Sequence, residues 1–409
     1  MKTLFSLLFP LMVVQGALTA AQAVPTSNPA DQAEAVSGNN AFAVDLYSQL
    51  SKQPGNLFFS PESISTAFGM AYAGARGQTA TQIEHVFHFT LPTDRLHPAM
   101  GALLAALNSQ HTGYELHAAD ALWAQQDESF LPDYLKLVQT DYGAGFRPVD
   151  FKTSPEAARA AINQWVEDQT NDKIQNLLEP GTVTAATRLI LTNAIYFKGT
   201  WLNEFNLSDT NAEDFHLTAK QTAKTQMMNR TGEGYSYYDG GAFQEIELPY
   251  QGGCSMIVLL PKAIDGLPAL ERSFTAAKAT EWIKKLDPAA KVVLTFPRFS
   301  LTQQFELSGT LAQMGMPLAF SGAADFSGMD GKQDLAISAA IHKAFVDVTE
   351  EGTEAAAATA ITMVATAMRQ EIPPPPPIVF RADHPFLFLI YDNDTGSILF
   401  LGRVADPTK

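Results

Sequence analysis

The side chains that most often carry out chemistry in proteins are few in this sequence and match no catalytic pattern. Five of the eight histidines fall between His85 and His117, and His85 and His88 stand three residues apart. Histidines at this spacing are far more often ordinary surface or core residues than metal ligands. The sequence contains no GxSxG elbow, no HExxH and no phosphate loop ending in GK[ST]. We therefore expect no enzymatic activity, no metal site and no cofactor.

The single cysteine, Cys254, carries no sign of a reactive thiol. It precedes an apolar run at residues 256–260, which favours a buried strand position over a reactive one. One cysteine cannot form an internal disulfide. The fold must therefore be held by its hydrophobic core alone.

The most unusual segment is residues 352–368, which are mostly alanine, threonine and small aliphatic residues. They follow two glutamates and precede the prolines at 373–377. Composition alone favours a surface helix and a stiff linker, because alanine has the highest helix propensity and consecutive prolines are extended. The alternative is an exposed loop that can become a strand.

Four widely separated motifs resemble one family, the serpins. They are residues 56–65 (NLFFSPESIS), 192–201 (TNAIYFKGTW), 342–356 (HKAFVDVTEEGTEAA) and 380–388 (FRADHPFLF). They occur in the family's order and cover the chain from about residue 39 to residue 407. Each motif is long, so chance agreement is negligible.

The resemblance implies an α+β fold of about nine helices and three β-sheets, with an exposed reactive-centre loop at about residues 350–372. It implies an inhibitor of serine proteases whose native state is metastable and whose loop the target protease recognises as a substrate. The target serine cleaves the loop and becomes acylated, and the freed loop then inserts as a central strand of the main sheet and distorts the trapped protease. Such an insertion adds a strand to an existing sheet and releases strain stored in the native state.

The segment's own pattern supports insertion. An inserted strand alternates faces with a period of two, so the odd-numbered residues from Thr353 to Ala365 would share one face. All of them are small or apolar enough to be buried, and the only charge, Glu354, falls on the other face. A helix would scatter these residues without a clear apolar side. We therefore favour the insertable loop over the helix.

The resemblance also assigns roles to individual residues. A polar cluster beneath the sheet, called the shutter in this family, would control the opening of the sheet. An ion pair and a tryptophan, the breach, would lie at the point of first entry, with arginine where lysine is common and able to fork onto the glutamate. The hinge residues are Glu350, Gly352, Thr353, Glu354, Ala355, Ala356, Ala357 and Ala358; the shutter residues are Ser60, Ser63, Asn193 and His342; the breach residues are Trp201, Arg298 and Glu350.

Counting along the loop from Glu350 places the cleaved bond at Thr366–Ala367. The long proline run leaves this register open by about three residues, and Arg369 is the alternative. Small or aliphatic residues around the bond suit a small specificity pocket, so elastase-like or subtilisin-like targets are favoured. Cleavage at Arg369 would instead suit a trypsin-like protease.

Two rival functions remain within the same family. A non-inhibitory carrier, chaperone or storage protein would often have bulky, charged or proline residues in the hinge, and this hinge has none beyond the glutamates. A heparin-activated inhibitor needs clustered lysine and arginine, and residues 77–134 contain only Arg95. Inhibition without a polyanion cofactor is therefore the favoured hypothesis.

The elements that position these residues can be read along the chain. Asn39 is expected to cap a helix carrying Phe42, Leu46 and Leu50, and a second helix is expected to open at residues 154–156. Residues 188–197 predict a strand buried on both faces. Three further strands are expected at residues 256–260, 386–391 and 398–404, the last two joined by a hairpin turn at 393–396.

The chain's ends and charge bound its location and partners. Residues 1–23 have the features of a secretory signal peptide, with Lys2, an apolar run and an Ala-Gln-Ala cleavage site. Residues 24–38 are expected to be a flexible lead-in, and residues 39–409 a single domain. Secretion into the extracellular space is thus expected. The signal and the lack of disulfides fit a bacterial source, in which case the destination could be the periplasm. The net charge of −16 disfavours nucleic-acid and membrane partners. The resemblance implies that the partner is a target serine protease, which forms a covalent complex with a monomer of this chain.

Overall fold

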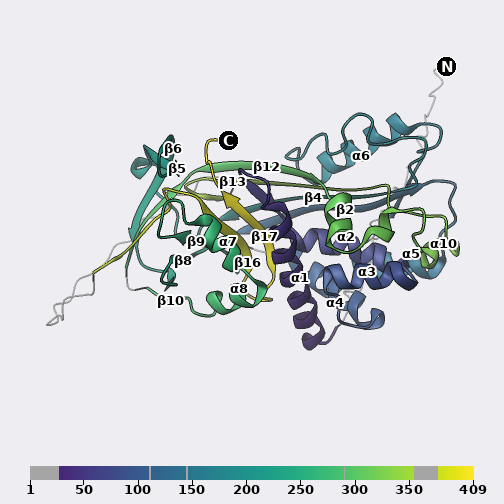
Figure 1. The fold of residues 1–409 in the computed structure, drawn as a ribbon, viewed down its shortest axis with the longest axis horizontal. Coiled ribbons are helices and arrows are strands. Elements are labelled where there is room, and N and C mark those ends of the chain that lie inside the picture. Colours follow the sequence, from purple (N-terminus) through teal and green to yellow (C-terminus); the bar gives the residue numbers. More distant parts are fainter. Residues whose placement is uncertain (1–26, 110–111, 144–145, 290, 354–375) are drawn as a thin grey trace, which may run out of the picture.

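The computed structural model describes residues 27–109, 112–143, 146–289, 291–353 and 376–409. Within these ranges the chain forms ten α-helices, two short 3₁₀ helices and three β-sheets (Figure 1). This confirms the α+β class and the three sheets expected from the sequence. The helices are α1 (Pro29–Leu50), α2 (Pro61–Gly74), α3 (Gly77–Phe87), α4 (Thr93–Leu107), α5 (Pro132–Tyr142), α6 (Pro155–Gln169), α7 (Leu267–Ser273), α8 (Ala276–Ile283), α9 (Ser308–Met314) and α10 (Ser327–Asp330), with η1 (Leu207–Asp209) and η2 (Pro317–Phe320).

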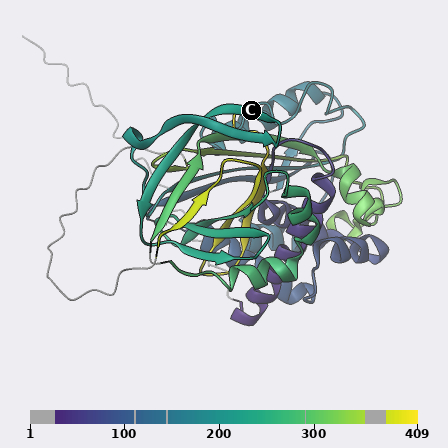
Figure 2. The same cartoon turned by 60° about the vertical axis from the view of Figure 1, so that its left-hand side comes forward.

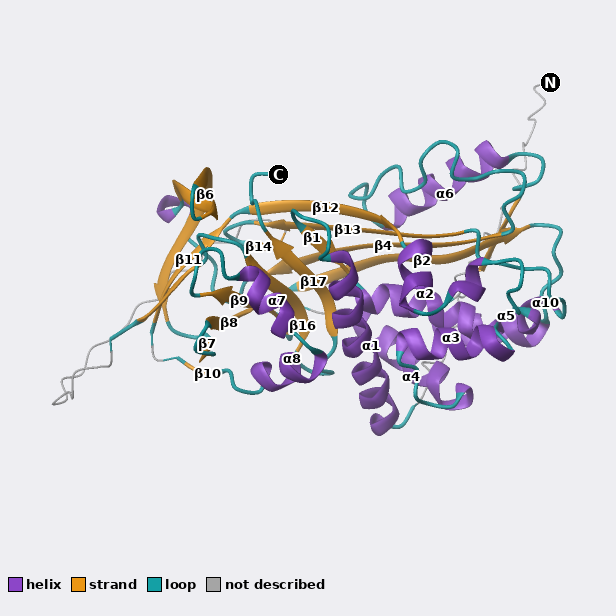
Figure 3. Cartoon of the chain, viewed as in Figure 1, coloured by secondary structure: helices purple, strands orange, loops and turns teal. Residues whose placement is uncertain are grey.

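The six-stranded sheet, here called the main sheet, runs along most of the molecule (Figure 3). Its order is β12 (Phe299–Glu306), β13 (Ala339–Val348), β14 (Gly352–Thr353), β4 (Leu189–Thr200), β2 (Tyr114–Gln125) and β3 (Phe146–Val149). Strand β4 is antiparallel to β2 and parallel to β13, so the sheet is mixed. The predicted buried strand at residues 188–197 is confirmed as β4.

Two further sheets, of seven and four strands, complete the fold. The second sheet has the order β1 (Leu57–Phe59), β17 (Ile398–Val404), β16 (Phe386–Asp392), β9 (Cys254–Pro261), β8 (Phe243–Pro249), β7 (Ser236–Asp239) and β10 (Asp287–Pro288). The third sheet, which lies at one end of the molecule (Figure 2), has the order β15 (Ile378–Arg381), β11 (Val292–Pro297), β6 (Gln221–Gly232) and β5 (Asn211–Thr218). The predicted β16–β17 hairpin is confirmed, and Cys254 is buried in β9 as expected.

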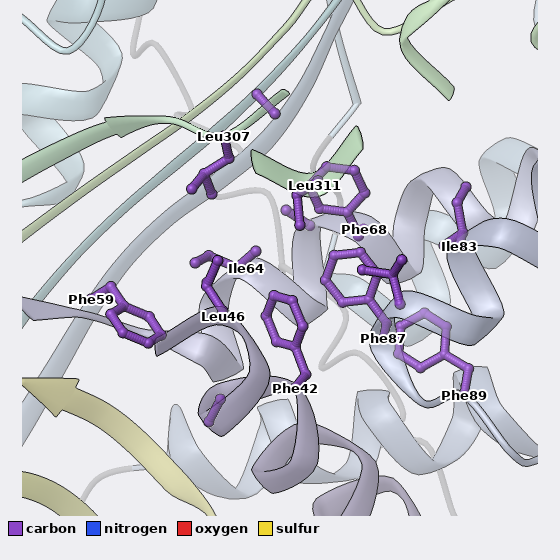
Figure 4. Packing of buried hydrophobic residues seen from close by; sticks show 14 of the residues in the cluster. Phe42, Leu46, Phe59, Ile64, Phe68, Ile83, Phe87, Phe89, Leu307 and Leu311 are labelled. Carbon is purple, nitrogen blue, oxygen red and sulfur yellow. The ribbon is translucent and has the colours of Figure 1, made fainter. Parts of the chain in front are cut away.

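The core lies on both faces of the main sheet. On one face, α6 packs Ile162 and Val166 against the sheet, and its start at Pro155 confirms the predicted helix. On the other face lie α1 to α5 (Figure 1), where Phe42, Phe68 and Phe87 pack together (Figure 4). The ring centroids of Phe42 and Phe87 are 4.4 Å apart. Burial on both faces explains why β4 reads as a continuous apolar run.

The expectation of a flexible lead-in over residues 24–38 is wrong for residues 29–38, which form the first turns of α1. Asn28 caps this helix by accepting a hydrogen bond from the Ala30 amide at 2.9 Å, and Pro29 occupies the first helical position. Asn39 is therefore not a cap. It lies buried in the middle of α1, where its amide donates to the Ile398 carbonyl at 3.1 Å. The small polar composition of this segment predicts a linker, but the segment also contains a complete helix start in Asn28 and Pro29.

In the described part of the chain, no helix combines the length and the hydropathy needed to cross a membrane.

One carboxyl group in the second sheet is buried without a partner. Glu245 in β8 is 0% exposed, and neither of its oxygens has a hydrogen-bond partner in the described structure. Burial raises the pKa of Glu245 to about 8, because the charged form loses its hydration.

This carboxyl should make stability fall as the pH rises. Its folded pKa lies above its unfolded value, so its stabilising contribution is complete below about pH 4.5 and is lost as the pH passes about 8. At pH 7 the unfolded carboxyl group is ionised and the folded one is not, which lowers the free energy of unfolding by about 3 kcal/mol compared with its value at low pH. Glu245→Gln should therefore reduce the loss of unfolding free energy between pH 5 and pH 8, measured in urea, by about 3 kcal/mol. An unchanged pH slope would contradict the buried, unpaired state of Glu245.

Candidate functional site

The chain turns back on itself directly after β13 and enters the main sheet. The Thr349 amide donates to the Gly352 carbonyl at 2.7 Å, which closes a tight turn. Gly352 and Thr353 then form β14, which is antiparallel to β13 on one side and to β4 on the other. Thr353 is opposite Val348 of β13 and Gly199 of β4. Strands β13 and β4 are thus already separated at this end by the two residues of β14.

Further along, the same two strands pair with each other directly. They form a parallel ladder from Ala339 opposite Ile190 to Phe345 opposite Tyr196. The line between β13 and β4 is here called the seam. Because β14 points into the seam, residues that follow Thr353 could extend it only by separating this ladder.

Glycine is required at the entrance to the seam. Gly352 has a φ of +148°, and a Cβ atom there would lie 2.0 Å from the Gly199 carbonyl oxygen. Gly199 is itself confined, because a Cβ atom on it would lie 2.7 Å from the Phe197 ring. Contacts this short are not tolerated by any other residue. The entry of β14 therefore depends on two glycines in contact across the sheet.

Thr353 is fully buried and is held by a tyrosine of the second sheet. Its Oγ1 lies 2.8 Å from the Tyr250 hydroxyl, and either group can donate. Burial raises the pKa of Tyr250, so the phenol stays protonated at neutral pH. The Tyr250 ring stacks on Trp201 with centroids 4.3 Å apart, and the Trp201 indole donates to the Thr349 carbonyl at 3.0 Å. Trp201 and Tyr250 thus contact both ends of the turn that leads into β14.

The breach residues predicted from the sequence do lie together, but the ion pair is loose. Arg298 approaches the buried Glu350 carboxylate through one nitrogen, Nε, at 3.6 Å, and its side chain is 42% exposed. The expected forked pair is therefore wrong. The stronger partner of Glu350 is Thr210, whose hydroxyl donates to Oε1 at 2.7 Å. Backbone bonds from Phe205 and Trp201 to the Glu350 and Glu351 carbonyls fix the same turn.

The four predicted shutter residues also lie together, at the middle of the seam. His342 of β13 and Asn193 of β4 are opposite each other, and the His342 imidazole bonds the Asn193 side-chain oxygen. The Ser60 amide donates to His342 Nε2 at 3.1 Å. Nε2 is thus an acceptor, so Nδ1 carries the proton and donates to Asn193. Burial lowers the pKa of His342 to about 3, so the ring is neutral at physiological pH.

A fifth residue, which the sequence analysis missed, completes this cluster. Asp120 of β2 accepts from the Ser63 hydroxyl at 2.8 Å and from the Asn193 amide at 2.6 Å. Burial raises the pKa of Asp120 well above its ordinary value. A lone aspartate among alanines in an apolar strand was the available signal. Tyr250 was also missed, because nothing in its local sequence marks it as a partner of Thr353.

Several predicted residues fall outside the described residues, and the first part of the predicted loop is not exposed. Glu350 is buried in the turn after β13, and Gly352 and Thr353 are buried in the sheet, so the start of the exposed loop at about residue 350 is wrong. The chain is described again from residue 376 and forms β15, parallel to β11. The residues outside the described ranges are Glu354, Ala355, Ala356, Ala357, Ala358, Thr366, Ala367 and Arg369.

The histidines between His85 and His117 do not assemble a metal site within the described ranges. There, no group of three or more histidine, cysteine, aspartate or glutamate side chains is arranged to hold an ion. His88, at the end of α3, instead pairs with Asp45 at 2.8 Å.

Comparison with known proteins places nearly the whole chain in one family. Residues 37–407 match the family described as Serpin (serine protease inhibitor). Leukocyte elastase inhibitor A of Mus musculus is 41% identical over 382 residues, which cover 91% of this chain and 99% of that protein. The crystal structure of uncleaved ovalbumin matches with a TM-score of 0.81 and 32% identity, over 91% of this chain and all of that one. Human thyroxine-binding globulin, in complex with its hormone, matches with a TM-score of 0.83 and 30% identity, over 93% of this chain and all of that one.

Proposed function

The chain belongs to the serpin family, and from that premise we propose that it is a single-use inhibitor that traps serine proteases by inserting its own loop into the main sheet. The target's serine oxygen attacks a carbonyl carbon between residues 354 and 375. The peptide bond breaks, its nitrogen leaves as a new N-terminus, and an ester joins the protease to the N-terminal part of the loop. That part then continues β14 along the seam and carries the protease with it.

The observation that carries this proposal is the position of β14. Its two residues are antiparallel to both neighbours, which is the pairing that a longer inserted strand would keep. Insertion therefore extends a strand that has already started, and the costly first separation of the sheet has been made. The next residues, from Glu354 to Ala358, are a glutamate and four alanines, which offer little steric resistance.

We assign the gate to the cluster at the middle of the seam. The bond between His342 and Asn193 crosses the seam and must break as a strand passes. Asn193 stays attached to Asp120 and Ser63 on its own side, so the sheet would divide cleanly between β4 and β13. Trp201, Arg298 and Glu350 would hold the turn from which the strand enters.

The favoured targets are elastase-like or subtilisin-like proteases. The residues around Thr366–Ala367 are small or aliphatic, and a relative that is 41% identical is named a leukocyte elastase inhibitor. A trypsin-like protease acting at Arg369 is the alternative. The action is stoichiometric, because each inhibitor molecule is consumed, and so the protein is not an enzyme.

A carrier function is the second candidate, since a solved structure of similar fold belongs to a thyroxine-binding globulin. Against it stand the small hinge residues and the two-glycine entrance to the seam, which a carrier would not need. We also propose that residues 1–23 direct the chain out of the cytoplasm, to the extracellular space or a periplasm.

Mixing the protein with a pancreatic elastase should produce an adduct that survives boiling in SDS. A C-terminal peptide that begins at or near Ala367 should be released, as measured by mass spectrometry. A trypsin arm should give a peptide beginning after Arg369 if the alternative bond is used. Clean cleavage without an adduct, by every serine protease of a broad panel, would contradict the inhibitory function and favour the carrier.

A further inference from the structure

The first turn of α2 lies beneath the seam and is bonded to both sides of it. The backbone amide of Ser60, which caps the helix, donates to His342 of β13 at 3.1 Å. The Ser63 hydroxyl donates to Asp120 of β2 at 2.8 Å, and β2 in turn pairs with β4. When β13 separates from β4, at least one of these bonds must break. Opening of the seam therefore uncovers the first turn of α2 to water.

Glu62 lies between these two serines in the sequence and is largely buried. Its carboxyl group accepts a hydrogen bond from the Thr66 hydroxyl at 3.1 Å and has no ion pair among the described residues. It lines a cavity of about 30 Å³ between α1, α2 and α4, whose apolar lining includes Leu96, Met100 and Leu107. A space of this size holds about two water molecules at most. A charge on Glu62 would thus have neither a cation nor a hydration shell.

A second carboxyl group, that of Asp120, lies nearby on the sheet side. Thr66 lines both the cavity of Glu62 and the cavity beside Asp120. Burial raises the pKa of Asp120 well above its ordinary value, and the nearby charge of Glu62 raises it further. Burial also raises the pKa of Glu62, to about 7. The two groups titrate as a pair, and the first charge falls on Glu62, because the N-terminus of α2 favours an anion there.

The other titratable groups on the sheet side do not change charge near neutral pH. Tyr142 and Arg147 line the cavity beside Asp120. Burial raises the pKa of Tyr142 well above its ordinary value, and it lowers that of Arg147, a group that ordinarily titrates far above neutral pH. Burial lowers the pKa of His342 to about 3, so this ring is already neutral.

Two further titratable groups line the cavity of Glu62 on its helix side, Glu34 and His88. Glu34 accepts a hydrogen bond from the Thr90 hydroxyl at 2.6 Å, and His88 pairs with Asp45 at 2.8 Å. Histidine as a residue type can change charge near neutral pH, so His88 requires a control variant of its own.

From this geometry we infer that Glu62 is a pH-dependent restraint on the seam: when it is uncharged the first turn of α2 holds the sheet closed, and when it is charged the open sheet, in which water reaches it, is favoured. The closed sheet binds the proton more tightly than the open one. Its advantage from Glu62 is therefore complete below the ordinary pKa of 4.5 and is lost as the pH rises through about 7. Loop insertion should then be faster at pH 8 than at pH 6. This last consequence rests on the proposed function; pH-dependent opening does not.

The test measures amide hydrogen exchange of the full-length protein by mass spectrometry at pH 6 and pH 8, corrected for the intrinsic effect of pH on exchange. Protection of the ladder between residues 339–345 and residues 190–196 should fall about tenfold over this range in the wild type. Glu62→Gln should give a protection that does not change with pH. Asp120→Asn keeps an oxygen acceptor for both of its hydrogen bonds and should retain the fall, because the first charge lies on Glu62.

Glu245→Gln and His88→Gln are the matched controls. Glu245 is also a buried carboxyl group with a raised pKa, but it lies in the second sheet, so its variant reports any effect of pH on the stability of the whole fold. Both controls should retain the tenfold fall. Constant protection in the wild type, a fall that persists in Glu62→Gln, or a fall that disappears in Asp120→Asn or in either control would overturn the restraint by Glu62.

The effect on trapping is measured separately, as the number of inhibitor molecules consumed per elastase molecule inactivated. The wild type and Glu62→Gln are compared at the same pH, so that the pH dependence of the protease itself cancels. The excess of this number over one should be larger in the variant, and the ratio of the two excesses should rise up to about tenfold from pH 6 to pH 8. A constant ratio, with the exchange result intact, would overturn the effect on insertion alone. No trapping by either protein at either pH would overturn the proposed function alone.

Discussion

Cleaving the chain once between Thr353 and Ile378 is expected to raise the midpoint of thermal unfolding by about 20 °C or more, although no residue is removed. The uncut chain is held at both ends of this segment, by β14 in the main sheet and by β15 in the third sheet. A cut between them frees the part of the segment that follows β14 from its attachment to β15. The residues after Thr353 can then continue β14 along the seam.

The size of the effect follows from the ladders exchanged. Full insertion replaces one parallel ladder between β4 and β13 by two antiparallel ladders, a net gain of about ten hydrogen bonds worth ~1 kcal/mol each. Burial of the alternate small apolar side chains adds about 5–10 kcal/mol. An unfolding entropy of about 0.9 kcal/mol/K for a chain of this size converts the sum into about 20 °C.

Calorimetry of the intact and the cut protein, with the cut made by a non-target protease and both fragments kept, measures this directly. Cutting instead before residue 27 is the matched control and should leave the midpoint within a few degrees. Equal midpoints for the intact and the loop-cut protein would mean that the native state is not metastable.

Much of the fold could be predicted because its elements obey simple local rules. Strand β4 is apolar along its length since it is covered by α6 on one face and by the helices on the other. The β16–β17 hairpin has a turn sequence between two apolar runs. The start of α1 obeys equally simple rules through Asn28 and Pro29, and it was missed because composition was weighed above position.

The candidate site was predictable only where a residue's type was unusual for its surroundings. Ser60, Asn193 and His342 are polar residues in apolar strands and turns, and the family motif named them. The contact of Gly352 with Gly199 joins residues more than 150 positions apart, and the bond from Tyr250 to Thr353 joins two sheets. Such contacts depend on packing between distant segments, which no local pattern records. For the same reason the burial of Thr353 before cleavage could not be foreseen.

Thr353→Arg is expected to turn the inhibitor into a substrate. The native side chain is 0% exposed, its hydroxyl lies 2.8 Å from the Tyr250 hydroxyl, and Gly199 lies opposite it. A guanidinium in this place would be a buried, unpaired charge, which costs several kcal/mol. The hinge should therefore leave the seam, and re-entry after acylation should be slowed.

Insertion competes with hydrolysis of the ester that links the protease to the loop. A penalty of ~3 kcal/mol at entry slows insertion by roughly a hundredfold, so the protease should complete its hydrolysis and escape. Thr353→Arg should be cut at the same bond as the wild type, while the number of molecules consumed per protease inactivated rises at least about tenfold. Thr353→Val keeps the shape and loses only the bond to Tyr250, at a cost of about 1 kcal/mol, and should trap nearly as well as the wild type.

Glu354→Arg is the matched control for charge, because the strand period of two places residue 354 on the face opposite to Thr353. Its arginine would point away from Tyr250, so it should trap with nearly wild-type stoichiometry. The two variants add the same side chain at adjacent positions, and only the face differs. If both lose trapping, charge near the hinge matters and the alternation that begins at Thr353 is wrong. If neither does, the burial of Thr353 beside Tyr250 has no part in the trap, and insertion must begin from a residue beyond β14.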